Sequence, residues 1–156
     1  MCPEKSGFRG VLPMIDKKSG IAYEQELVRL FKDAQYTAFR LPGSSARSPD
    51  ILAGDRSSVF VIEVKTTRGS RVKIRKSQIH TLLKCAHDLN AEARVALRFI
   101  DRDSSWRIVK PNALEIHEKS YSIDYNNACL RGLEFHELVS NELQKRFQCN
   151  QGNLSV

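Results

Sequence analysis

The 156-residue sequence contains only four cysteines, five prolines and eight glycines, and it has no long apolar run. The cysteines lie far apart without a C-x-x-C pair, which excludes a dense disulfide scaffold and indicates free thiols. No segment approaches the roughly 20 apolar residues that span a bilayer, and no apolar stretch of signal-peptide length follows the first methionine, so we expect a cytoplasmic protein. With 41% apolar and 28% charged residues, the chain has the length and composition of one soluble globular domain.

Acidic residues are too few to balance the basic ones, and the imbalance lies in the first half of the chain. The 25 lysines and arginines exceed the 18 aspartates and glutamates by seven. Residues 1–80 hold 15 basic and 8 acidic side chains, whereas residues 81–156 hold 10 of each. The segment 65–76 contains six basic residues and no acid, and we expect it to be a loop. Such a block attracts a polyanion, most commonly a nucleic acid, although a solvated basic loop is the alternative interpretation.

Apolar periodicity divides the chain into an N-terminal lead-in, 1–19, one folded domain, 20–147, and a C-terminal tail, 148–156. Amphipathic helices are expected at 20–34, 79–89 and 135–147. Extended segments are expected at 36–41, 50–53, 59–65, 95–100 and 106–109, with a hairpin turn at 54–57. Residues 111–128 are ambiguous. This order of elements predicts an α/β sandwich, with a central mixed β-sheet flanked by helices.

The predicted strand 59–65 carries two charged side chains at the end of an otherwise apolar segment. Because side chains alternate along a strand, Glu63 and Lys65 share one face, and Phe60, Ile62 and Val64 share the other. Burying a charge without a partner costs several kcal/mol or more. We therefore expect these two residues either to have a function or to lie at an exposed strand end.

Asp50 is the candidate partner of this pair. If the turn closes a hairpin, Asp50 pairs near Val61 and lies diagonal to Glu63. Two carboxylates held so close together repel each other unless a cation neutralises them. Oxygen ligands of this kind suit Mg²⁺. Lys65 is then placed to orient an attacking water or to stabilise charge on a phosphate. These residues favour metal-dependent phosphodiester hydrolysis, with a structural ion-pair set as the alternative.

Pro49-Asp50, then twelve residues, then Glu63-Val64-Lys65 resembles the P-D…E-x-K core of the restriction-endonuclease-like nuclease superfamily. Further segments appear in the order seen in archaeal-type Holliday junction resolvases, and these are 20–27, 39–40, 42–45, 49–54 and 61–65. The resemblance implies a restriction-endonuclease-like fold. It also implies a homodimeric crossover junction endodeoxyribonuclease that uses Mg²⁺, or Mn²⁺ in its place, to resolve four-way DNA junctions in recombination and repair. Paired symmetric nicks would leave 3′-hydroxyl and 5′-phosphate ends.

The resemblance further implies roles for individual residues. Glu24 completes a metal-binding acidic set with Asp50 and Glu63, while Lys65 assists catalysis. Arg40 belongs to the catalytic centre and contacts DNA. Two implied residues lie on a loop that approaches the junction, Ser44 (catalytic) and Ser45 (DNA-binding). A third, Gln78 (DNA-binding), lies on the helix behind the metal site.

The basic segment is expected to position DNA through its phosphates, and its DNA-binding residues are Arg68, Arg71, Lys73, Arg75 and Lys76. Phosphate contacts carry little base information, so selectivity would come from junction shape and from two equivalent sites in a two-fold dimer. Apolar surface of the helix 135–147 or of the sheet would form the dimer contact, and DNA would associate the protein with the nucleoid. The alternatives are a nuclease for flaps, mismatches or duplex DNA, a non-catalytic DNA-binding protein with this fold, and a nuclease for RNA.

Overall fold

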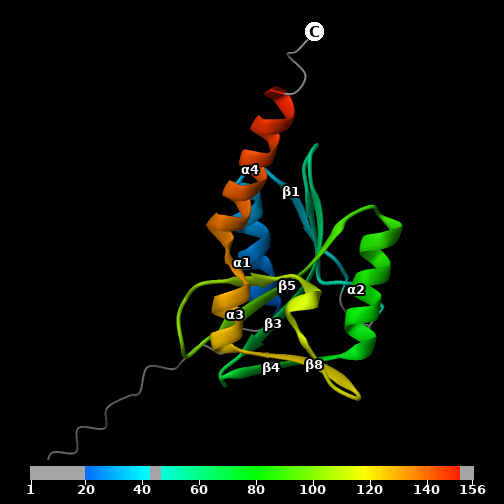
Figure 1. Ribbon diagram of the computed structural model, residues 1–156, viewed down its shortest axis with the longest axis vertical. Helices are drawn as coiled ribbons and strands as arrows, with labels where there is room; N and C mark the ends of the chain where they lie inside the picture. The colour runs from blue at the N-terminus through cyan, green and yellow to red at the C-terminus, as the bar shows by residue number, and fades with distance from the viewer. Residues whose placement is uncertain (1–19, 43–46, 152–156) are drawn as a thin grey trace, which may run out of the picture.

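The computed structural model describes residues 20–42 and 47–151, which form two β-sheets with helices around them (Figure 1). The helices of these ranges are α1 (Gly20–Asp33), α2 (Lys76–Asp88), α3 (Tyr125–Arg131) and α4 (Phe135–Gln151), with a 3-10 turn, η1, at Pro111–Ala113. The strands are β1 (Thr37–Arg40), β2 (Ile51–Gly54), β3 (Val59–Thr67), β4 (Arg71–Arg75), β5 (Glu92–Phe99), β6 (Arg107–Val109), β7 (Glu115–Ile116), β8 (Ser120–Asp124) and β9 (Leu133–Glu134).

The main sheet is mixed, as the sequence predicts. Its six strands lie in the order β1-β2-β3-β5-β6-β9. Only β3 and β5 pair in parallel, and the chain between them runs through β4 and α2. The other neighbours in the sheet are antiparallel. A second, antiparallel sheet has the order β4-β8-β7.

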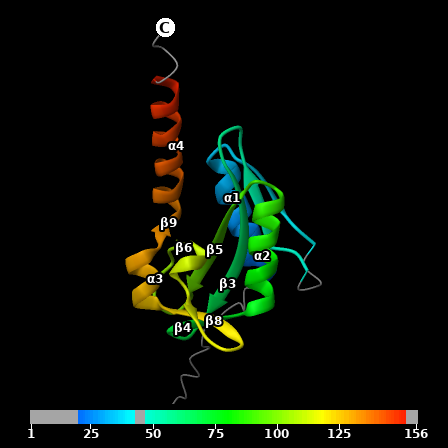
Figure 2. The ribbon, with the colours of Figure 1, turned by 45° about the vertical axis from the view of Figure 1, so that its right-hand side comes forward.

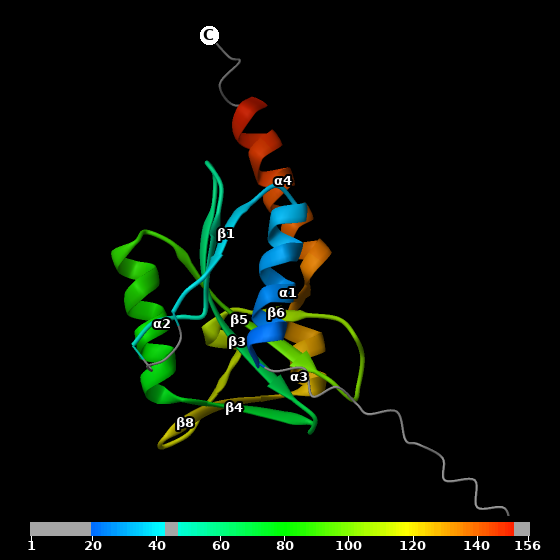
Figure 3. The same ribbon diagram turned by 180° about the vertical axis from the view of Figure 1, so that it is seen from behind.

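Helices α1 and α2 lie on opposite sides of β3, as the front and back views show together (Figures 1 and 3). Each helix buries its apolar stripe in a separate core. The core on the α1 side includes Leu27, Phe31, Phe60, Ile62 and Val64. The core on the α2 side includes Val61, Ile79, Leu82, Val95 and Leu97. The alternation predicted for β3 is therefore confirmed, and it turns Glu63 away from the face that holds Phe60, Ile62 and Val64.

The hairpin between β2 and β3 closes through a four-residue turn, in which the Asp55 N–H donates to the Ser58 carbonyl at 2.8 Å. A side chain on Gly54 would approach the same carbonyl to 3.0 Å, which explains the glycine. The predicted register was wrong, because the turn lies at 55–58, one residue later than the predicted 54–57. Leu52 pairs with Val61, so Asp50 lies level with the end of β3 that carries Glu63.

The basic segment 65–76 is not the loop that the sequence suggested. It comprises the end of β3, a short turn, the strand β4 and the first residue of α2. Along β4 the apolar Val72 and Ile74 are buried, whereas Arg71, Lys73 and Arg75 are exposed. The basic side chains thus stand on one face of a strand whose other face belongs to the core.

Helix α4 begins at Phe135, as predicted, and extends beyond the sheet at its C-terminal end (Figure 2). Leu138 is buried, but Leu143 and Phe147 are exposed, so only the first part of its apolar stripe enters the core. The helix continues past residue 147 to Gln151. Within the described ranges, every helix is too short or too polar to cross a membrane.

Candidate active site

Asp50, Glu63 and Lys65 lie together because the hairpin places the start of β2 beside the later part of β3. The Lys65 ammonium Nζ lies 3.0 Å from Glu63 Oε1. The Asp50 carboxylate Oδ2 accepts a hydrogen bond from the Val64 N–H at 2.7 Å. The backbone N–H between Glu63 and Lys65 therefore fixes the orientation of Asp50.

Gln78 joins this group from the first turn of α2. Its side-chain amide Nε2 donates to Glu63 Oε1 at 3.0 Å. Its carbonyl oxygen accepts from the backbone N–H of Arg75, just before the helix, at 3.4 Å. One side chain thus satisfies an N–H next to the start of α2 and holds the buried glutamate. The resemblance implies that Gln78 binds DNA, which stays a prediction, and the structure shows that its side chain contacts Glu63.

Burial and neighbouring negative charge disfavour the ionised form of both carboxylates. Glu63 is only 3% exposed. Its desolvation, with the charge of Asp50 as the next cause, raises the pKa of Glu63 to about 7, even though Lys65 acts in the opposite direction. Desolvation also raises the pKa of Asp50, while the hydrogen bond from Val64 lowers it. The two carboxylates therefore repel each other, and a bound cation would reduce this repulsion.

Glu24 approaches the group from α1, and its charge contributes to the raised pKa values of Asp50 and Glu63. Its carboxylate is held by Arg40, at the end of β1, through a 2.6 Å contact between Arg40 Nε and Glu24 Oε2. Both side chains are partly exposed. This ion pair was not predicted, because neither residue is near the other in sequence.

The donor chemistry of the three carboxylates fits a divalent cation, since hard oxygen ligands are what Mg²⁺ prefers. Over residues 20–42 and 47–151, no three His, Cys, Asp or Glu side chains are grouped closely enough to hold a metal ion. Two of the three carboxylates contact protein cations instead, Glu24 with Arg40 and Glu63 with Lys65. A cation at this group would compete with Arg40 and Lys65 for the same carboxylates.

The basic residues expected to contact DNA differ in how far their charge is already neutralised. Arg68 pairs with Asp101 at 3.1 Å. Arg71 lies 3.0 Å from Glu115 and 3.7 Å from Asp124. The other three are Lys73, Arg75 and Lys76. None of them forms an ion pair with a residue that the structure describes. The uncompensated charge of the segment is therefore concentrated at the end of β4 and the start of α2.

The structure accounts for the remaining predicted residues only in part. Ser44 and Ser45 lie outside the described residues. Sequence reasoning did not find the Val64 N–H that orients Asp50, since a backbone donor carries no residue signature. It also missed Arg98 of β5, which contacts Glu26 at 3.2 Å and the ring of Tyr23, the two residues that flank Glu24 along α1.

Comparison with curated proteins finds similar chains among archaeal nucleases. The chain is 31% identical over 134 residues to the "Crossover junction endodeoxyribonuclease Hjc" of Archaeoglobus fulgidus, a match covering 84% of this chain and 96% of that protein. It is 25% identical over 122 residues to the protein of the same name from Methanocaldococcus jannaschii, covering 78% and 87%. A "Crossover junction endodeoxyribonuclease Hje" of Saccharolobus solfataricus is 28% identical over 97 residues, covering 59% and 71%.

Among solved structures, Archaeoglobus fulgidus Hjc, described as a Holliday junction resolvase, matches with a TM-score of 0.70 and 30% identity, covering 78% of this chain and 95% of that one. The mixed sheet, its flanking helices and these relatives define an α/β nuclease. The family model described as "Archaeal holliday junction resolvase (hjc)" matches residues 15–147. The chain belongs to the archaeal Holliday junction resolvase family, and the resemblance expected from the sequence is confirmed.

Proposed function

We propose that this protein is a Mg²⁺-dependent, structure-selective endonuclease that resolves four-way DNA junctions by paired symmetric nicks, in recombination and repair. Membership of the resolvase family supports the reaction. The main structural support for the site is the contact of buried Glu63 with Lys65 and Gln78. The Val64 N–H holds Asp50 beside this group. Binding to DNA would associate the protein with the nucleoid.

The proposed roles are those that the resemblance implies, and the contacts above support those of Asp50, Glu63 and Lys65. Asp50, Glu63 and Glu24 would hold the divalent ion, Mg²⁺ or Mn²⁺ in its place, and the ion would supply Lewis-acid polarisation of the phosphate and a lowered pKa of the attacking water. Lys65, released from Glu63, orients the water or stabilises the charge that develops on phosphate oxygen. Cleavage leaves a 3′-hydroxyl and a 5′-phosphate.

Arg40 is proposed as a residue that serves both the acidic group and the DNA. Its guanidinium pairs with Glu24. A phosphate entering the site offers Arg40 an alternative anion, and Glu24 is then available to the ion. On the other side of the acidic group, Lys73, Arg75 and Lys76 hold the DNA through phosphates. Ser44 and Ser45 are proposed to contact the junction, as the resemblance implies.

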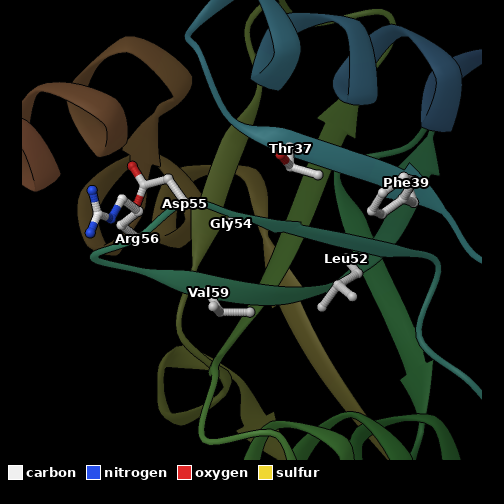
Figure 4. A pocket seen from close by; sticks show the side chains of 7 residues that line it. All are labelled: Thr37, Phe39, Leu52, Gly54, Asp55, Arg56 and Val59. Carbon is white, nitrogen blue, oxygen red and sulfur yellow. The ribbon is translucent and has the colours of Figure 1, made fainter.

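We further propose that the active form is a homodimer, because two symmetric nicks require two equivalent sites. An open pocket of about 420 Å³ lies on the face of the sheet opposite α1, at the edge formed by β1, β2 and β3 (Figure 4). Phe39 and Leu52 are paired across β1 and β2 and thus share this face, and Phe39 is 55% exposed. We propose that a second copy of the chain covers this apolar face. Because Arg40 follows Phe39 in β1, the Arg40 residues of both copies would then lie near the interface.

Cleavage of a labelled synthetic four-way junction, beside duplex, flap and single-stranded controls, tests the substrate. With Mg²⁺ we expect paired nicks in the junction and little cutting of the controls, and with EDTA no cutting. Equal rates on duplex and junction would contradict the proposed resolvase activity. Cutting of the flap alone would favour a repair nuclease.

A further inference from the structure

A second open pocket lies beside the candidate active site, on the exposed face of α1 and the end of β1. Its volume is about 560 Å³, and it is lined by Gln25, Val28, Arg29, Lys32 and Arg40. Three of these five residues are cationic, one is a neutral hydrogen-bond donor, and none is acidic. Val28 is 9% exposed and provides an apolar floor. This composition suits an anion.

The helix itself gathers these groups. Gln25, Arg29 and Lys32 are spaced four and three residues apart, so they follow one another along one face of α1. At the 1.5 Å rise of an α-helix, the row extends over about 10 Å. All three side chains are exposed, and each is long enough to reach an anion above the helix.

The positive charges of this row are not compensated by nearby acids. Neither Arg29 nor Lys32 forms an ion pair with any residue in the ranges that the structure covers. By contrast, Arg98 of β5 forms an ion pair with Glu26 of the same helix. Exposed like charges that repel each other along one face of a helix are mildly destabilising. A bound anion would remove that repulsion.

Arg40 connects the pocket to the acidic group, since it lines the pocket and lies 2.6 Å from Glu24. An anion in the pocket therefore lies next to the proposed reaction centre and on the α1 side of it. Lys73, Arg75 and Lys76 lie instead on the segment that packs with α2, against the other face of the sheet.

We propose that Gln25, Arg29, Lys32 and Arg40 form a phosphate-binding groove that takes the backbone of the cleaved DNA strand adjacent to the scissile linkage. This inference rests on the proposed nuclease function and extends it. DNA would then be held from both sides of the acidic group, by the α1 groove and by the basic end of β4. A guanidinium and an ammonium bind phosphate without reading the base, so the contact adds affinity and strand position rather than sequence preference.

The test is the salt dependence of junction binding, measured in EDTA so that no cleavage occurs. Lys32→Ala is compared with Lys84→Ala, an exposed helical lysine on α2 that pairs with Asp88. Each lost phosphate contact lowers the slope of log Kd against log salt by about 0.9. We expect Arg29→Ala and Lys32→Ala each to lower the slope by about one and to weaken binding several-fold at about 0.1 M salt, with Lys84→Ala unchanged. Slopes for both α1 variants equal to that of Lys84→Ala would overturn the groove.

A chemical probe then locates the contact on the DNA. Single neutral methylphosphonates are placed at successive positions around the cleavage point of the junction. One position should weaken binding to the wild-type protein but cause no further loss with Arg29→Ala, because the contact is already absent. Independent, additive losses at every position would contradict the proposal.

Failure of the groove is distinguishable from failure of the proposed function. Selective junction cleavage by the wild-type protein, with salt slopes unaffected by Arg29→Ala and Lys32→Ala, overturns the groove alone. The opposite result is that Arg29→Ala and Lys32→Ala lower the salt slope of binding on every DNA, while the wild-type protein shows no preference for cutting the junction. That result overturns the resolvase proposal and supports the groove.

Discussion

The Asp50 carboxylate accepts a hydrogen bond from the Val64 N–H at 2.7 Å, and this contact ties the start of β2 to the part of β3 that carries Glu63 and Lys65. Asp50 is held close to a second carboxylate even though the two repel each other. Such a group is stable only because the surrounding sheet fixes it, which is typical of a site built for a ligand rather than for stability.

The raised pKa of Glu63 predicts a pH-dependent stability in the absence of metal. The folded-state pKa is about 7, above the ordinary 4.5, so the protonated form is favoured by folding. The stabilisation is complete below about pH 4.5 and is lost as the pH rises through 7. Glu63→Gln removes this loss, and we expect it to raise the free energy of unfolding by roughly 1–3 kcal/mol at pH 8 and to change it little at pH 4.5.

Thermal or urea unfolding at the two pH values measures this effect, with exposed Glu118→Gln as the control. Addition of Mg²⁺ at pH 8 should stabilise the wild-type protein more than Glu63→Gln, because the ion binds the folded carboxylates. A Glu63→Gln variant that is less stable than the wild-type protein at pH 8 without metal would contradict the electrostatic account.

Arg40→Gln tests the exchange of partners proposed for Glu24. The ion pair is partly exposed, so its loss should change stability by less than about 1 kcal/mol. We expect the single-turnover cleavage rate to fall by roughly 10- to 1000-fold, because Arg40 serves both the phosphate and the acidic group. A variant that cuts junctions at the wild-type rate would remove Arg40 from the site.

Arg98 is expected to act as a positioning residue for Glu24. Its guanidinium carbon lies 5.8 Å from the centre of the Tyr23 ring and 5.2 Å from that of Trp106, and it pairs with Glu26. Since Tyr23 and Glu26 flank Glu24 along α1, Arg98 fixes this part of the helix against β5. Arg98→Ala should raise the Mg²⁺ concentration that gives half-maximal cleavage, while junction binding in EDTA stays unchanged.

Arg94 provides the matched control, because it is a buried arginine of the same strand that lies 5.3 Å from the Phe60 ring and pairs with Glu92. Each alanine variant should cost about 1–3 kcal/mol of stability. Only Arg98→Ala should alter the Mg²⁺ dependence at a temperature where both variants are folded. An equal change in both would show that Arg98 contributes stability alone.

Much of this site was predictable from the sequence, because it depends on local patterns. The alternation of β3 separates Glu63 from Phe60 and Ile62, and the D…E-x-K spacing singles out Asp50 and Lys65. The class of fold also followed from the order of amphipathic helices and apolar strands. The alternation and the class of fold need only residue types and periods, whereas the D…E-x-K spacing is informative because it resembles the motif of a nuclease superfamily.

The contacts that depend on tertiary structure were not predictable. Segment 71–75 has a clear two-residue period, but its three cations favoured a loop. The partners of Arg71 are Glu115 on β7 and Asp124 on β8, and no local pattern indicates that these strands form a sheet with β4. Likewise, the register of β2 against β3 was missed because the turn, 55–58, lies one residue further along the chain than the predicted 54–57.

Phe39→Glu tests the proposed homodimer. Phe39 is more than half exposed on an apolar face of the sheet, so the change should not disturb the core. We expect the wild-type protein to sediment as a dimer and Phe39→Glu as a folded monomer with little paired nicking. Ile116→Glu, at an exposed position on β7, is the control. A wild-type monomer, or a Phe39→Glu dimer, would exclude this face as the interface.

We expect Asp50, Glu63 and Lys65 to form the catalytic centre of a junction-cutting nuclease. The most direct test is the single-turnover cleavage rate of a four-way junction by Glu63→Gln at saturating protein, beside Glu118→Gln, with junction binding measured in parallel. We predict that Glu63→Gln binds the junction as well as the wild-type protein or better, since one negative charge is removed, and cuts it at least about 1000-fold more slowly. Cleavage by Glu63→Gln at the wild-type rate would contradict the account.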